Sequence, residues 1–122
     1  MTFPALPYLI DGETKLTDTY AIMKYIASKH GPFLLGSDPA QTAQIEMLAS
    51  VVQDLKQSVT LPCYTTGNRA GITTNLLQKV KPIVAYLGQK NFLVDNDDPC
   101  YVDFAFFELC DFMNWISEGK LF

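Results

Sequence analysis

Few residues of this 122-residue chain are of the types that do chemistry on their own. The only histidine, His30, stands at the end of a predicted helix, where a cation suits the helix dipole, so we interpret it as a cap. One histidine gives no basis for a Ser–His–Asp or Cys–His pairing. The cysteines are odd in number and form no C-x-x-C pair, which predicts neither a disulfide framework nor a zinc site. They are Cys63, Cys100 and Cys110.

Two clusters of polar side chains could bind an ion or a ligand. Asp95, Asp97 and Asp98 lack the twelve-residue spacing and the closing glutamate of an EF-hand loop, so they predict a polar turn. Asp18 and Thr19 stand at the start of a predicted helix, where free backbone amides favour a bound carboxylate. Thr19 is therefore a natural contact for an anionic ligand.

The first elements expected are a hairpin and a helix. Leu6 to Leu16 alternates as two short strands, and Asp11 and Gly12 favour the positive φ values of a tight turn. Thr17 or Asp18 can cap the helix that follows. Its expected inner face is Ala21, Ile22, Tyr25 and Ile26, and Gly31-Pro32 ends it.

Helices account for the rest of the chain. The cap and proline at 37–39 predict a helix start, and this helix runs to Pro62. Residues 65–73 predict a loop, and the next helix is expected to kink at Pro82. Tyr101–Ile116 is apolar nearly all round, which predicts a helix buried on every side. The inner positions expected for the two preceding helices are Ile45, Leu48, Val52, Leu55 and Val59, then Leu76, Leu77, Val80, Ile83, Val84 and Leu87. One core is expected from Ile45, Leu48, Val52, Leu76, Val80, Phe104, Phe107 and Trp115.

Composition limits the partners and the location. The net charge of −4 comes from acids distributed along the chain with no Lys/Arg cluster, so nucleic acid is excluded as an expected partner. No apolar run approaches the roughly 18 residues of a membrane span, so no membrane insertion is expected. The cysteine pattern favours a reducing intracellular location, in the cytoplasm or in an organellar assembly.

A resemblance to the glutathione transferase family, and to its mu class, rests on three stretches. Residues 3–12, FPALPYLIDG, resemble the family's third strand, in which a leucine precedes a cis proline. Residues 15–30 resemble its glutathione-binding turn and the helix after it. Residues 45–64 and 101–104 resemble the long first helix and the buried central helix of its all-helical domain. The likeness covers nearly the whole chain and is weakest at 65–75.

The resemblance implies an α+β fold in two parts. Residues 1–32 are expected to form a partial thioredoxin-like domain, a β-hairpin plus a helix. Residues 38–122 are expected to form a partial all-helical domain. In the family, a strand–helix–strand segment with the tyrosine that stabilises the glutathione thiolate precedes the part seen here, and further helices follow. We therefore expect a copy truncated at both ends.

The resemblance also implies a glutathione site. Leu6 and Pro7 match the backbone that pairs with the cysteinyl unit, or they only form the turn. Asp18 and Thr19 stand where the family holds the γ-glutamyl group, although Asp18 serves equally as a cap. Asp54 matches an aspartate that reaches the glutathione amine from a neighbouring subunit, or it is a solvated helix-face carboxylate.

The resemblance implies one residue that could assist catalysis. Tyr64 matches a tyrosine that faces the electrophile, or it packs at a helix end, and no candidate stands at the position of the thiolate-stabilising hydroxyl. Asp103 matches a capping-box acid of the buried helix.

Two functions follow from these expectations. The first is a non-catalytic transferase-like subunit of a larger assembly, and the alternative is a fragment of an active mu-like enzyme that conjugates glutathione to electrophiles. No cofactor is expected beyond glutathione as a co-substrate. The expected partner is a protein, a second copy or a larger assembly, that covers the open sheet edge and the apolar helix.

Overall fold

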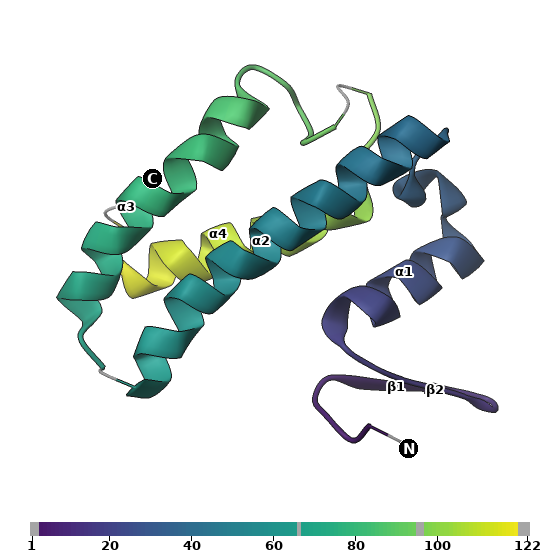
Figure 1. Ribbon diagram of the computed structural model, residues 1–122, viewed down its shortest axis with the longest axis horizontal. Coiled ribbons are helices and arrows are strands. Elements are labelled where there is room, and N and C mark those ends of the chain that lie inside the picture. The colour runs from purple at the N-terminus through teal and green to yellow at the C-terminus, as the bar shows by residue number, and fades with distance from the viewer. Residues whose placement is uncertain (1–2, 66, 95–96, 120–122) are drawn as a thin grey trace.

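The computed structural model describes residues 3–65, 67–94 and 97–119. A short two-stranded sheet is followed by helices, which confirms the expected α+β class. Figure 1 shows the hairpin and the first helix at one end of the molecule and α3 at the other, with α2 and α4 between them. The elements are β1 (Tyr8–Asp11), β2 (Thr14–Thr17), α1 (Thr19–His30), the 3-10 helix η1 (Pro32–Leu35), α2 (Pro39–Thr65), α3 (Arg69–Leu87) and α4 (Tyr101–Ile116).

The hairpin pairs β1 with β2 in antiparallel register, from Tyr8 opposite Thr17 to Asp11 opposite Thr14. Gly12 has φ of 59° at the first central position of the turn, where type II′ turns place glycine. The expected Asp11-Gly12 pair of positive φ values is therefore wrong for Asp11, which belongs to the strand. The expected cis peptide bond between residues 6 and 7 is confirmed.

The start of α1 is capped by Asp18, whose Oδ1 accepts a hydrogen bond from the Ala21 N–H at 2.9 Å. The inner face of α1 differs from the expected one. Ala27 is its buried residue, and Tyr20 and Met23 pack against the core. Of the four predicted inner residues, Ala21 and Ile26 are exposed, and Ile22 and Tyr25 are half-buried. The predicted face does not meet the core because α1 also packs against the hairpin.

The long helix α2 begins where the sequence predicts it. Asp38 Oδ1 accepts hydrogen bonds from the N–H groups of Ala40 and Gln41 at 2.8 and 2.9 Å, and Pro39 occupies the first helical position. The helix does not stop at Pro62 but continues to Thr65, because a proline removes one backbone hydrogen bond without ending every helix. All five predicted inner positions, Ile45, Leu48, Val52, Leu55 and Val59, are buried.

The next helix, α3, starts inside the stretch that predicts a loop. Asn68 caps it by accepting a hydrogen bond from the Gly71 N–H at 3.1 Å, and Ile72 in its first turn is buried. Of the predicted inner positions, Leu77 and Val84 are exposed, because α3 is covered on one side only. Leu76, Val80 and Ile83 are buried, and Leu87 packs against the core.

One face of α4 packs against α2 and α3, and the opposite face is open. Phe104, Phe107 and Trp115 are 55%, 75% and 69% exposed, so the predictions of burial on every side and of these three residues in the core are wrong. The apolar content of a helix predicts what it prefers to contact, but within the described residues no element covers this side. The buried residues of α4 are Tyr101, Val102, Phe106, Leu109, Met113 and Ile116.

Asp103 joins the start of α4 to the turn before it. Its carboxylate accepts hydrogen bonds from the backbone N–H groups of Leu93 and Cys100, both at 2.8 Å. The predicted capping-box role is confirmed by the second of these bonds. Leu93 is completely buried, so the bond also fixes the turn against the core.

Glu46 on α2 connects the first part of the chain to the last. One carboxylate oxygen pairs with Lys24 Nζ of α1 at 2.8 Å, and the other accepts a hydrogen bond from the Tyr101 hydroxyl of α4 at 3.1 Å. The rings of Tyr20 and Tyr101 meet edge to face at 6.3 Å. These contacts hold α1 against α2 and α4. The division of the chain into a part at residues 1–32 and a part at residues 38–122 remains a prediction.

No helix among the described residues is long and apolar enough to cross a membrane. The same residues hold no group of three or more histidine, cysteine or acidic side chains placed to bind a metal ion.

Candidate functional site

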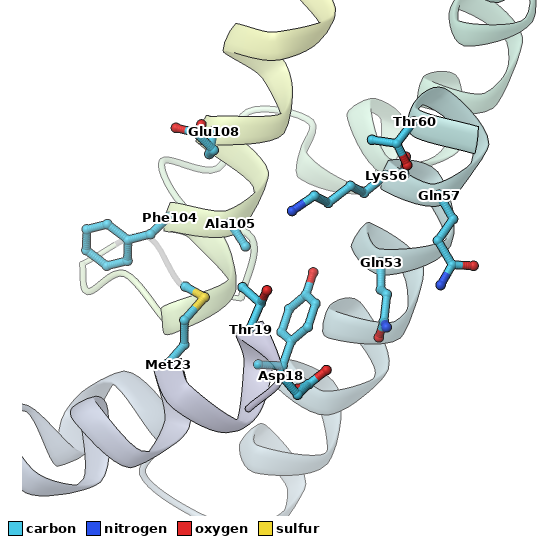
Figure 2. Close-up of a pocket in the computed structure, with 11 residues that line it drawn as sticks. Asp18, Thr19, Met23, Gln53, Lys56, Gln57, Thr60, Phe104, Ala105 and Glu108 are labelled. Carbon is cyan, nitrogen blue, oxygen red and sulfur yellow. The ribbon is translucent and has the colours of Figure 1, made fainter. Parts of the chain in front are cut away.

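A cleft of about 360 Å³ opens where the start of α1 meets α2 and α4. Figure 2 shows the lining residues on these three helices, with Thr19 and Lys56 extending into the space between them and with Phe104 and Glu108 pointing away from α2. The lining residues are Asp18, Thr19, Tyr20, Met23, Gln53, Lys56, Gln57, Thr60, Phe104, Ala105 and Glu108.

The α1 side of the cleft contains the two residues that the sequence predicts for a γ-glutamyl group. Asp18 has φ of 81°, a conformation that costs a non-glycine residue about 1–3 kcal/mol and is found preferentially at functional sites. This conformation places Thr19 at the first helical position, where backbone N–H groups lack helical partners. The structure therefore brings Asp18 and Thr19 together at a place suited to a carboxylate.

Tyr20 adds a neutral phenol to the cleft. Burial, followed by the charge of the Asp18 carboxylate, raises the pKa of the Tyr20 hydroxyl above its ordinary value of 10.0. At neutral pH the hydroxyl stays protonated, so it is available as a hydrogen-bond donor. The sequence analysis did not select this residue.

The α2 side supplies a cation and amides that sequence reasoning also missed. Three- and four-residue spacings, 53 to 56 or 57 and these to 60, place four residues on one side of the buried stripe of α2: Gln53, Lys56, Gln57 and Thr60. In Figure 2 the Lys56 side chain extends from α2 toward α4 across the cleft. The sequence does show these polar residues as a row beside the apolar stripe of α2. It does not indicate that α1 and α4 face this row.

Leu6 and Pro7 lie elsewhere in the structure. Leu6 is 85% exposed and lines a separate hollow of about 390 Å³ with Pro4, Ala5 and Tyr8. The predicted pairing of this backbone with a cysteinyl unit therefore belongs to a different surface from the cleft at α1, and it remains a prediction.

Asp54 and Tyr64 are both exposed on α2, and neither lines the cleft. Tyr64 is 90% exposed, one residue before the end of the helix. Their expected roles toward a neighbouring subunit and an electrophile stay predictions.

The cysteines do not add a nucleophile to the site. Burial raises the pKa of Cys100 to about 12 and that of Cys110 to about 11, so both thiols are protonated at neutral pH. Cys63 is exposed at the far end of α2, where its thiol donates a hydrogen bond to the Val59 carbonyl at 3.2 Å.

The cleft thus combines groups whose charges suit a zwitterionic polar ligand. Lys56 and the start of α1 suit carboxylates, while Asp18 and Glu108 suit an ammonium group. Thr19, Tyr20 and the two glutamines add neutral hydrogen-bonding groups.

Comparisons with known proteins find similarity along nearly the whole chain. Glutathione S-transferase class-mu 26 kDa isozyme 7 of Fasciola hepatica is 33% identical over 124 residues, covering 99% of this chain and 56% of the relative. Glutathione S-transferase Mu 1 of Bos taurus is 33% identical over 123 residues, covering 98% of this chain and 55% of the relative. No family model matches the chain.

The fold is also similar to that of a glutathione S-transferase. The crystal structure of the glutathione S-transferase Blo t 8 superposes with a TM-score of 0.79 at 25% identity, over 97% of this chain and 56% of that one. The hairpin with α1 accordingly corresponds to part of a thioredoxin-like domain, followed by a helical domain. The likeness in sequence and fold runs along nearly the whole chain, which spans about half the length of these relatives, so the chain is homologous to that part of the glutathione S-transferases and resembles their mu class.

Proposed function

We propose that this chain binds glutathione or a related γ-glutamyl peptide in the cleft at the start of α1 and serves as a non-catalytic subunit that contacts other proteins. The observation that carries the first part is the placement of Thr19, Lys56 and Glu108 around one cleft. Its relatives are named as glutathione S-transferases.

The charges of the ligand match those of the cleft. Glutathione has two carboxylates and one ammonium group. The free N–H groups at the start of α1 receive one carboxylate, and Lys56 receives the other. The ammonium group is bound by the carboxylates of Asp18 and Glu108. Each bond is made in a partly enclosed space, where a charged hydrogen bond contributes about 1.5–3 kcal/mol.

The absence of catalysis is proposed from the positions of the hydroxyls. A thiol with an ordinary pKa of about 8.5 needs a donor directed at its sulfur to become a thiolate at neutral pH. Among the described residues, Tyr64 lies outside the cleft, and the backbone of Leu6 lines another hollow. The hydroxyls of Thr19 and Tyr20 are at the end of the cleft that suits a carboxylate.

The alternative is conjugation of glutathione to an electrophile, and one observation favours it. Tyr20 presents a protonated phenol in the cleft, and a phenol is the kind of donor that stabilises a thiolate. In this case Tyr20, and not Tyr64, would act on the sulfur.

Calorimetric titration with glutathione tests the binding. Thr19→Val keeps the shape and removes the hydroxyl, and Lys56→Met removes the cation; each is expected to weaken binding about tenfold or more. Lys79→Met on the exposed side of α3 is the matched control and should leave the affinity unchanged. Equal affinity in all four proteins would refute the proposed site.

An assay of conjugation to a generic aromatic electrophile separates the two functions. The non-catalytic proposal expects no rate above the uncatalysed one with saturating glutathione. Turnover that Tyr20→Phe abolishes while glutathione still binds would establish the alternative.

A further inference from the structure

A buried tyrosine lies directly behind the cleft. Tyr101, the first residue of α4, is 2% exposed and is not among the residues that line the cleft. Its ring meets the ring of Tyr20 edge to face, with 6.3 Å between the centroids and 73° between the ring planes. Tyr20 does line the cleft. Tyr101 thus packs against a cleft residue without lining the cleft itself.

The Tyr101 ring is held by two helices. Its backbone belongs to α4, and its hydroxyl donates a hydrogen bond to Glu46 Oε1 of α2 at 3.1 Å. The other oxygen of Glu46 pairs with Lys24 Nζ of α1 at 2.8 Å, which fixes the carboxylate in turn. Burial, followed by the charge of Glu46, raises the pKa of the Tyr101 hydroxyl, so it remains a donor at neutral pH.

The Tyr20 side chain depends on packing for its position. Among the residues that the structure describes, none accepts a hydrogen bond from the Tyr20 hydroxyl. This leaves the hydroxyl available to a ligand, but it also means that no polar contact fixes the ring. The edge-to-face contact with Tyr101 is a specific geometry that aromatic pairs favour, so it can fix the ring instead.

We propose that Tyr101, oriented by Glu46, is a positioning residue of the cleft. It holds the Tyr20 ring so that the Tyr20 hydroxyl donates to the ligand carboxylate bound at the start of α1. A side chain that is ordered before the ligand arrives lowers the cost of binding, so Tyr101 contributes to affinity without touching the ligand. This inference rests on the glutathione site proposed above and adds the residues that act behind it.

A double-mutant cycle with glutathione as the probe tests whether Tyr101 acts through Tyr20. In calorimetric titrations, Tyr101→Leu is expected to weaken binding about fivefold, as the loss of one hydrogen bond would. When Tyr20 has already been replaced by phenylalanine, the same change should weaken binding less than about twofold, because the hydroxyl that Tyr101 positions is missing. Equal losses in the two backgrounds would overturn the proposal.

Conservative variants separate the ring from its anchor. Tyr101→Phe keeps the ring and removes its hydroxyl, so it should weaken binding only about two- to threefold. Glu46→Gln keeps an acceptor for the Tyr101 hydroxyl and should retain most of the affinity, whereas Glu46→Leu should lose at least as much as Tyr101→Phe. Equal affinities of Glu46→Gln and Glu46→Leu would refute the part assigned to Glu46.

Controls separate positioning from stability, because Tyr101 is buried and its replacement also destabilises the fold. Leu109→Ala removes a buried side chain of the same helix that does not line the cleft, and it should leave the affinity of the folded protein unchanged. Tyr86→Leu makes the same chemical change at an exposed position on α3. A loss for Leu109→Ala as large as that for Tyr101→Leu would overturn the proposal. If Tyr101→Leu does not fold, the cycle is measured with Tyr101→Phe.

The pKa of Tyr20 reports the position of its ring without a ligand. NMR of ring-labelled tyrosine, with the Tyr20 signal identified from Tyr20→Phe, follows this pKa. It should lie closer to its ordinary value of 10.0 in Tyr101→Leu than in the native chain, because a released ring is less buried. An unchanged pKa would refute the positioning. Failure of the native chain to bind glutathione would refute the proposed cleft, and the NMR titration would still decide the role of Tyr101, so the two failures can be told apart.

Discussion

Replacing Asp103 tests whether one carboxylate holds the turn before α4 in place. Its two oxygens accept hydrogen bonds from the backbone N–H groups of Leu93 and Cys100, both at 2.8 Å, and both of these residues are buried. Asp103→Ala leaves two buried donors without an acceptor. A hydrogen bond to a charged group contributes about 1.5–3 kcal/mol, so we expect the free energy of unfolding to fall by about 3–5 kcal/mol. Asp103→Asn keeps one acceptor and should cost about half as much.

The assay is urea unfolding at pH 7, followed by circular dichroism, with the midpoint and slope fitted separately. Asp111→Asn is the matched control, because it makes the same chemical change on the exposed side of the same helix. It should change the free energy of unfolding by less than about 0.5 kcal/mol. A loss below about 1 kcal/mol for Asp103→Ala with an unchanged slope would refute the reasoning, since the two bonds would then contribute nothing beyond what water provides.

Three further predictions concern packing, pH and thiol reactivity. In the same urea assay, Phe107→Ala should lower the free energy of unfolding by less than about 1 kcal/mol, because Phe107 is exposed, whereas Leu109→Ala should lower it by about 2–5 kcal/mol, because Leu109 is buried. Comparable losses for the two variants would mean that the side of α4 that bears Phe107 is covered. Asp11 has its pKa lowered by hydrogen bonds from a lysine and a tyrosine of α1, so it stabilises the fold above its ordinary value of 3.8, and this contribution is lost as pH falls through the lowered value. The difference in urea midpoint between the native chain and Asp11→Asn should thus be present at pH 7 and vanish in acid; a constant difference would contradict it. A thiol reagent at pH 8 should label Cys63 quickly and Cys100 slowly until urea is added, as mass spectrometry of the labelled peptides will report.

Local signals predicted the elements well where one residue type dictates the backbone. The cap at Asp38 with Pro39 placed the start of α2, and the apolar period predicted the buried stripe from Ile45 to Val59. The start of α3 was missed because glycine and threonine dominate the composition there, although Asn68 supplies a cap.

Tertiary information was the part that the sequence could not provide. An apolar helix such as α4 shows a preference for burial on all sides, but which side meets α2 depends on the whole arrangement of elements. The cleft was half predicted for a similar reason. Asp18 and Thr19 are adjacent in the chain, whereas Lys56 and Glu108 come from two other helices and meet them only in the folded structure.

The unbroken length of α2 limits how relatives of this chain can vary. Its 27 residues form a rod of about 40 Å to which α1 is joined near one end through Glu46, while Val59 near the other end belongs to the core. Inserting or deleting one residue in the middle would rotate one end against the other by about 100°, turning the polar cleft-lining row away from α1. Changes of length should therefore accumulate in the connections after Thr65 and after Leu87, while α2 itself varies by substitution alone.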